Sequence, residues 1–340
     1  HFRFSMNSLP PIGENTSTVA IGDVDQDGDL DLFIGSSVVT GDYGANPKSS
    51  LLLNNGRGQF KDMTAAYFGP ELSLGMINAA KFADLNGDGK PELIITGDWN
   101  GIRIFSFENG KAQEMAAKGL EFSAGWIQAL EIADVDGNGK PDILVGNLGL
   151  NSKLKASREK PVWLYHHDID GNGQADPLIF HYMGEKLVPF ATRDDLIRQI
   201  PGVKKSHGSY AEYAQISKPE DLFPSQGIQK ARKLPAYEFR SGVYFQQGEG
   251  SFEFVSFPQE VQWSPISALA WDEKSKTLAF GGNSKDMRVD LGNSLNLNPG
   301  LLQWKDGAWS LVSQTFPQTK NPEIRAIRPI SIQGKFYFLG

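Results

Sequence analysis

Acidic and amide side chains recur at one fixed spacing in four short windows of the sequence. The windows are DVDQDGDLD (Asp23–Asp31), DLNGDGKPE (Asp84–Glu92), DVDGNGKPD (Asp134–Asp142) and DIDGNGQAD (Asp168–Asp176). Each has a side-chain oxygen at positions 1, 3, 5 and 9 and a glycine at position 6. Ca²⁺ takes about six to eight oxygen ligands, and glycine permits the left-handed backbone of a tight loop. The spacing therefore predicts four calcium-binding loops, numbered here from first to fourth.

The ligand set of each loop follows from its positions. Positions 1, 3 and 5 offer side-chain oxygens, position 7 offers its backbone carbonyl, and the acid at position 9 can bind through both oxygens. The predicted metal residues are Asp23, Asp25, Asp27, Asp29 and Asp31; Asp84, Asn86, Asp88, Lys90 and Glu92; Asp134, Asp136, Asn138, Lys140 and Asp142; and Asp168, Asp170, Asn172, Gln174 and Asp176.

Other interpretations of these windows are weaker. An EF-hand loop closes with an acid at position 12 and joins two helices, whereas these windows close at position 9 between short apolar runs of strand length. An ordinary Asp-Gly turn would explain one window but not the same four oxygen positions in four windows. Mg²⁺ is the weaker alternative because it keeps several waters, and Zn²⁺ prefers nitrogen and sulfur ligands. We therefore expect about four bound Ca²⁺ ions.

Composition excludes several other functions. The net charge is −7, and 14 of the 40 acidic residues lie in the four windows. This balance argues against a nucleic-acid-binding surface, which needs clustered Lys and Arg. No apolar run approaches the roughly 20 residues of a membrane span. The chain has no cysteine, so we expect the ions to stabilise the loops in place of disulfides.

The elements that must hold these loops are short strands. Each window joins two strand-like runs, and strand–glycine turn–strand units such as LLLNNGRGQFKDMT (residues 51–64) follow several of them. Four strands in about 50 to 60 residues are typical of a propeller blade. The sequence thus predicts an all-β fold, a β-propeller of six or seven four-stranded blades formed by residues 1–340. His1–Pro10 is predicted to be a strand that closes the last blade.

Two hairpins resemble blades without the acidic loop, at residues 263–283 and 324–340. Residues 185–238 interrupt the strands with charged segments of helical character, and are predicted to be a helical insertion within the propeller. The insertion is either a solvated cap or a lid that forms a pocket or docks a partner.

Two further groups of residues are candidates for ligand contacts. Trp99 and Trp126 lie near strand ends, where an exposed indole can stack on a sugar, although packing between blades is the commoner use of Trp. A polysaccharide lyase could use a base from the insertion beside a Ca²⁺-bound uronate. The side chains considered for that base are His181, Tyr182, Arg193, Lys204, Lys205, His207, Tyr210 and Tyr213.

The four loops, their strand context and the NNGRGQF turn resemble FG-GAP or VCBS repeats, the calcium-loop blades of integrin-type propellers. Residues 146–157 (GNLGLNSKLKAS), 189–201 and 236–252 are similar to segments of bacterial relatives of cartilage acidic protein. This resemblance implies a secreted or surface-exposed calcium-binding propeller. It implies no reaction, because one fold hosts many functions.

Three functions follow as expectations. The first is an exported, non-enzymatic binding or adhesion module on a bacterial surface, with a surface protein or a glycan as partner. The second is a calcium-assisted, lyase-like enzyme acting on glycans. The third is a structural subunit of a larger cell-envelope assembly. An exported location fits all three, because extracellular calcium modules have dissociation constants of about 0.1 to 1 mM and stay filled only outside cells.

Overall fold

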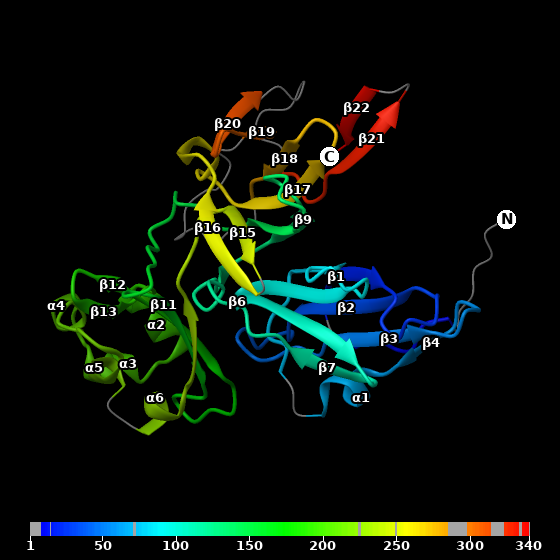
Figure 1. Ribbon diagram of the computed structural model, residues 1–340. Helices are drawn as coiled ribbons and strands as arrows, with labels where there is room; N and C mark the ends of the chain where they lie inside the picture. The colour runs from blue at the N-terminus through cyan, green and yellow to red at the C-terminus, as the bar shows by residue number, and fades with distance from the viewer. Residues whose placement is uncertain are drawn as a thin grey trace.

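The structure is a computed structural model that describes residues 8–13, 15–70, 73–223, 226–248, 250–284, 298–313, 323–332 and 335–339. Strands are far more abundant than helices among these residues, and nearly all of them pair antiparallel (Figure 1), which confirms the all-β prediction. Most residues of the strands that follow the first and third acidic windows are buried, as the apolar runs there require.

Two consecutive sheets begin the chain. The first sheet contains β1 (Asn15–Gly22), β2 (Asp31–Val38), β3 (Ser50–Asn54) and β4 (Phe60–Asp62), followed by the short helix α1 (Thr64–Phe68). The second sheet contains β5 (Ala79–Ala83), β6 (Glu92–Glu108), β7 (Lys111–Glu114) and β8 (Gly125–Trp126). The start of β6 pairs with β5 and its end pairs with β7, so this long strand has a different neighbour at each end.

The remaining sheets do not all follow in chain order. The third sheet contains β9 (Ala129–Ala133), β10 (Asp142–Gly146), β15 (Gly242–Gly248) and β16 (Ser251–Ser256). After the 3-10 helix η1 (Gln259–Val261), the fourth sheet contains β17 (Ile266–Asp272), β18 (Thr277–Gly282), β19 (Gly300–Lys305) and β20 (Ala308–Ser313). A two-stranded sheet follows, made of β21 (Arg328–Ile332) and β22 (Lys335–Leu339).

A separate unit, residues 147–241, is inserted between β10 and β15 of the third sheet. Its own sheet contains β11 (Val162–His167), β12 (Asp176–Met183), β13 (Lys186–Pro189) and β14 (Arg232–Ala236). Its helices are α2 (Arg193–Gln199), α3 (Val203–Ser206), α4 (Tyr210–Tyr213), α5 (Pro219–Leu222) and α6 (Gln226–Lys230). The helices lie inside the predicted segment 185–238. The interruption of the third sheet is longer than that segment, because it also contains the strands on which the helices pack.

The order of the strands within the sheets departs from their order in the chain. The fourth acidic loop joins β11 to β12 inside the inserted sheet. β15 pairs with β10, which lies before the inserted unit, so that Val145 lies opposite Gly242. Hydrophobic patterning cannot reveal this pairing, because β15 would be a buried strand beside any neighbour.

Apolar packing links the sheets through their first strands. β1 packs on β5, β5 on β9, β9 on β17 and β17 on β21. Buried clusters fill the space between neighbouring sheets, with Phe33 and Ile95 between the first and second and Leu144 and Phe280 between the third and fourth. In the part of the chain that the structure describes, these sheets do not form a closed propeller. Six or seven blades therefore stays a prediction.

The inserted unit lies against the first and second sheets (Figure 1). Leu164 and Phe239 of the unit share an apolar cluster with Met76 and Trp99. The His166 ring Nε2 also lies 2.5 Å from a carboxylate oxygen of Asp42, which lies in the connection between β2 and β3 of the first sheet. The predicted strand His1–Pro10 falls mostly outside the described residues.

Candidate metal centre

The acid at position 9 is buried in all four loops and holds the loop closed. Asp31 and Asp142 are fully buried, and Glu92 and Asp176 are at most 4% exposed. In each loop one oxygen of this acid accepts the backbone N–H of position 2, at 2.8 to 3.0 Å. The same contact in four loops shows that one local geometry is repeated, as the shared spacing predicted.

The second oxygen of this acid reaches outside the loop in the first and third loops. Asp31 accepts the N–H of Asn54 in β3, and Asp142 accepts the N–H of Gln246 in β15, at 2.8 and 2.9 Å. The sequence assigned these acids to the ion alone. The structure gives them a second role, which is to bond the loop to the third strand of its own sheet.

The other loop positions form nested turns stabilised by side-chain oxygens. The carboxylate at position 1 accepts the N–H of the position 6 glycine at 2.8 to 3.1 Å in every loop. The oxygen at position 5 accepts the N–H of position 7 at 2.8 to 2.9 Å. The glycines of position 6 have φ between 84° and 91°, which confirms the left-handed backbone predicted there.

Position 4 carries a second left-handed residue that sequence reasoning missed. Gly87, Gly137 and Gly171 occupy it in three loops with φ of 76° to 78°, and Gln26 occupies it in the first loop with φ of 61°. The recurring glycine at this position was a signal visible in the sequence.

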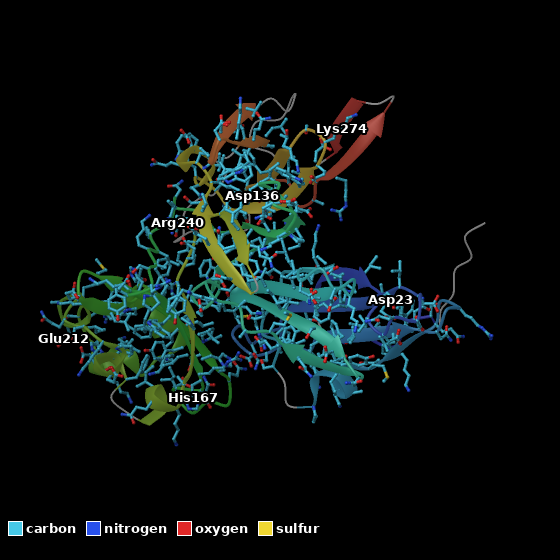
Figure 2. All side chains as sticks on the ribbon, in the orientation of Figure 1. Asp23, Asp136, His167, Glu212, Arg240 and Lys274 are labelled. Atoms are coloured by element: carbon cyan, nitrogen blue, oxygen red, sulfur yellow. The ribbon has the colours of Figure 1, made fainter. Side chains whose placement is uncertain are left out.

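Three of the four loops bring carboxylates close enough to share an ion. Candidate ligand atoms lie within 4.8 Å of one another in three groups, namely Asp23 with Asp25 and Asp27, Asp134 with Asp136 and Asp142, and Asp168 with Asp170 and Asp176. In Figure 2, Asp23 and Asp136 lie on different sheets, so these are separate sites.

A buried oxygen in the first loop indicates that a cation would fit there. Oδ1 of Asp23 is buried and has no hydrogen-bond partner among the described residues. A buried carboxylate oxygen without a partner is costly, and a hard cation held by oxygen ligands would remove that cost. The donor set therefore fits Ca²⁺.

Burial and mutual repulsion oppose the negative charge of the loop carboxylates. Desolvation, followed by the charge of Asp27, raises the pKa of Asp25. Burial raises the pKa of Asp142 to about 6, against the lowering effect of the N–H groups of Gln246 and Val135. A divalent cation would offset both the burial and the repulsion.

The second loop differs from the others. Its position 3 is Asn86, whose Nδ2 donates to Glu92 at 2.9 Å and to Asp88 at 3.3 Å. The amide thus stands between the acids, and the loop shows no group of three converging carboxylates among the described residues. At position 7 of the loops, the side chains of Lys90, Lys140 and Gln174 are exposed, as expected where only the backbone is needed.

The two candidate tryptophans pack together inside the protein. Trp99 is 4% exposed, which agrees with the packing alternative and not with a role as a sugar-stacking surface. Its φ of 54° turns the chain, and its Nε1 donates to the hydroxyl of Tyr43 at 2.8 Å. Trp126 is half-buried and meets Trp99 edge-to-face at 5.3 Å. A buried indole cannot stack on a sugar, so Trp99 serves packing.

Asp98, the chain neighbour of Trp99, is a carboxylate without a cationic partner in the described structure. Asp98 accepts hydrogen bonds from Asn78 and Gln128, each at 2.8 Å, and from Tyr43 at 3.2 Å. Desolvation raises its pKa although all three donors lower it. Sequence reasoning missed this network, because its three donors lie in separate connections, whereas Asp98 lies in β6.

Several side chains considered for a catalytic base are engaged within the inserted unit. Arg193 bonds the carbonyls of His207 and Gly208 and pairs with Asp194. The Tyr210 hydroxyl donates to Asp194, and the Tyr213 hydroxyl donates to the carbonyl of Ala191. These contacts connect the helices and loops of the inserted unit.

Comparisons with known proteins address part of the chain. A family model described as FG-GAP-like repeat matches residues 37–95 and again residues 84–145. No curated protein matches the chain, and no described helix is long and apolar enough to cross a membrane. The closer likeness to bacterial relatives of cartilage acidic protein stays a prediction. The matched residues include the second and third loops, so this part of the chain is similar to FG-GAP-like repeats.

Proposed function

We propose that this protein is an exported calcium-binding repeat module that acts by binding a partner and not by catalysis. The observation that carries the proposal is the convergence of carboxylates in three loops built on one hydrogen-bonded frame, with a partnerless oxygen on Asp23. The FG-GAP-like repeats support it, since repeats of this kind are suited to rigid binding surfaces.

The ions act on the shape of the loops. Each loop joins two strands and carries three or more acids within nine residues, which repel one another without a cation. Calcium at millimolar concentration would fill sites of this class outside a cell. The module is then rigid where it is exported and loosened where calcium is scarce.

Isothermal titration of the metal-free protein with Ca²⁺ tests this function. We expect uptake of about four ions, with Mg²⁺ binding more weakly. The double substitution Asp134→Asn with Asp136→Asn should remove one ion, and Asp62→Asn, on an exposed strand outside the loops, is the matched control. The metal role is wrong if the native protein takes up no Ca²⁺.

The partner is a surface protein or a glycan, and the module can belong to a larger cell-envelope assembly. A pull-down from envelope extract in Ca²⁺, repeated in chelator, tests this point. A protein retained only in Ca²⁺ supports a surface complex. Release of unsaturated sugar from a uronate polymer would instead establish a lyase, and would contradict the non-catalytic proposal.

A further inference from the structure

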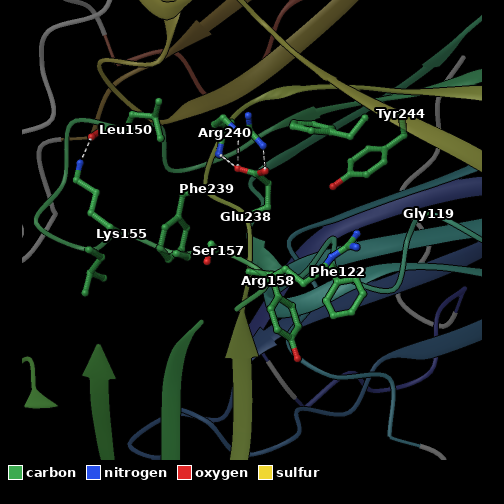
Figure 3. A pocket seen from close by; sticks show the side chains of 14 residues that line it. Gly119, Phe122, Leu150, Lys155, Ser157, Arg158, Glu238, Phe239, Arg240 and Tyr244 are labelled. Atoms are coloured by element: carbon green, nitrogen blue, oxygen red, sulfur yellow. Dashed lines mark hydrogen bonds and ion pairs between the residues drawn. The ribbon is translucent and has the colours of Figure 1, made fainter. Parts of the chain in front are cut away.

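A cavity of about 410 Å³ lies where the inserted unit joins the third sheet (Figure 3). Its walls come from four segments: the loop at residues 119–122, the arm that enters the inserted unit, the arm that leaves it, and strands β15 and β16. This volume is within the range of small-molecule sites. None of the four acidic loops lines it.

The walls of this cavity are held in place by backbone hydrogen bonds. The N–H groups of Tyr237 and Glu238 both bond the carbonyl of Ala124, at 2.7 and 3.1 Å. Gly149 at the start of the entering arm donates to the carbonyl of Phe239 at 2.8 Å. The cavity is therefore already formed in the free protein, which lowers the entropic cost of binding.

Positive charge gathers in the cavity of a protein whose net charge is −7. Lys155, Arg158 and Arg240 line it together with a single carboxylate, Glu238. Arg240 is paired with Glu238 through two hydrogen bonds, and Lys155 donates to the carbonyl of Leu150 at 2.7 Å. A cationic lining of this kind favours an anionic ligand.

Arg158 has no hydrogen-bond acceptor within the described part of the chain. Its guanidinium lies 4.2 Å from the centre of the Phe122 ring, and the neighbouring charge of Glu121 is its other interaction. Phe122 in turn packs edge-to-face on Tyr237 at 5.1 Å. The stacked guanidinium keeps its fork of N–H donors free, and this fork matches a carboxylate.

Tyr244 supplies a second free polar group. Its side chain is 3% exposed and lines the cavity, yet its hydroxyl has no hydrogen-bond partner among the described residues. Its ring packs on Phe254 at 4.7 Å. The hydroxyl is therefore available to a hydroxyl or carboxylate of a ligand in the cavity.

We propose that this cavity binds a small ring compound that carries a carboxylate, with Arg158 on the carboxylate and Tyr244 on a second polar group. The aromatic walls suit a flat ring or the apolar face of a sugar. A uronic acid and an aromatic carboxylic acid share this chemistry, and the test separates them. The site is independent of the calcium loops.

Calorimetric titration of the full chain in Ca²⁺ tests the proposal with three probes: glucuronate, benzoate and glucose. We expect one carboxylate probe to bind at least ten-fold more tightly than glucose. Tighter binding of glucuronate identifies a sugar acid, and tighter binding of benzoate identifies an aromatic acid. The proposal is overturned if neither acid binds, or if glucose binds equally well.

Two variants locate the binding. Arg158→Ala should weaken binding of the acid about ten- to a hundred-fold, as expected for a charge-assisted contact, while Arg57→Ala, on an exposed turn of the first sheet, should not. Tyr244→Phe should weaken binding about three- to ten-fold, and it should melt no lower than the native protein because its hydroxyl is unpaired. Unchanged affinity in either cavity variant contradicts the assigned contact.

Calcium titration of the same variants separates this proposal from the proposed function. Arg158→Ala should take up Ca²⁺ as the native protein does, because the cavity contains no loop ligand. Loss of acid binding with normal Ca²⁺ uptake supports both conclusions, and absence of Ca²⁺ uptake in the native protein would contradict the metal role alone.

Discussion

Asp142 of the third loop accepts a hydrogen bond from the backbone N–H of Gln246 at 2.9 Å, although the two residues are 104 positions apart in the chain. The inserted unit occupies that interval. Gln246 also extends its side chain to the second loop, where its Nε2 donates to the carbonyl of Leu85 at 3.1 Å. This pair therefore joins a predicted calcium loop to the strand that resumes the third sheet, and connects two neighbouring loops.

The loop acids are assigned two roles, to accept backbone hydrogen bonds and to bind the ion, and mutation can separate these roles. Asp142→Ala leaves the buried N–H groups of Val135 and Gln246 unpaired, and should lower the free energy of unfolding by about 2 to 4 kcal/mol even in chelator. Asp136 is exposed, so Asp136→Ala should change stability in chelator by less than about 0.5 kcal/mol. Urea denaturation with and without Ca²⁺ measures both, and equal losses in chelator would contradict the distinction.

Removal of calcium should destabilise the native protein. For a dissociation constant of about 0.1 to 1 mM, about 10 mM Ca²⁺ stabilises each site by roughly 1.4 to 2.7 kcal/mol. The melting temperature should thus fall by several degrees in chelator, with Mg²⁺ restoring less than Ca²⁺. Melting followed by circular dichroism checks this, and identical curves in chelator and in Ca²⁺ would show that the loops need no ion.

The Asp98 network predicts a pH dependence. Desolvation raises the pKa of Asp98 above 3.8, its usual value. As the pH rises above that value, the unfolded chain loses this proton before the folded protein does, so the contribution of Asp98 to stability falls until the folded carboxyl ionises. The stability of the native protein minus that of Asp98→Asn should therefore decrease with rising pH. A flat difference across the range would contradict the raised pKa.

Tyr43 should be the most sensitive member of that network. Its hydroxyl accepts from Trp99 and donates to Asp98, so Tyr43→Phe removes both contacts and should cost about 1 to 3 kcal/mol. Tyr182→Phe is a matched control, because Tyr182 is half-buried and its hydroxyl makes no hydrogen bond within the described structure. Equal urea midpoints for the two variants would show that the contacts contribute little.

Local chemistry was readable from the sequence because it depends on residues close together in the chain. The oxygens at alternate positions and the glycine at position 6 determine the turns of each loop through bonds that span two to seven residues. The apolar runs on either side likewise predicted the paired strands. Position 4 belonged to the same local pattern, and it was missed only because Gln26 breaks the run of glycines.

The order of the sheets and the cavity were decided by tertiary structure alone. No pattern in β15 distinguishes pairing with β10 from pairing with the strand before it, so the insertion at residues 147–241 could not be located. Asp98 and Tyr244 are ordinary residues in the sequence, and they become buried only when distant segments pack around them. By itself the sequence determined the four acidic loops and the strands beside them, since those depend on near neighbours, whereas long-range packing decided which strands pair and which polar groups are left free.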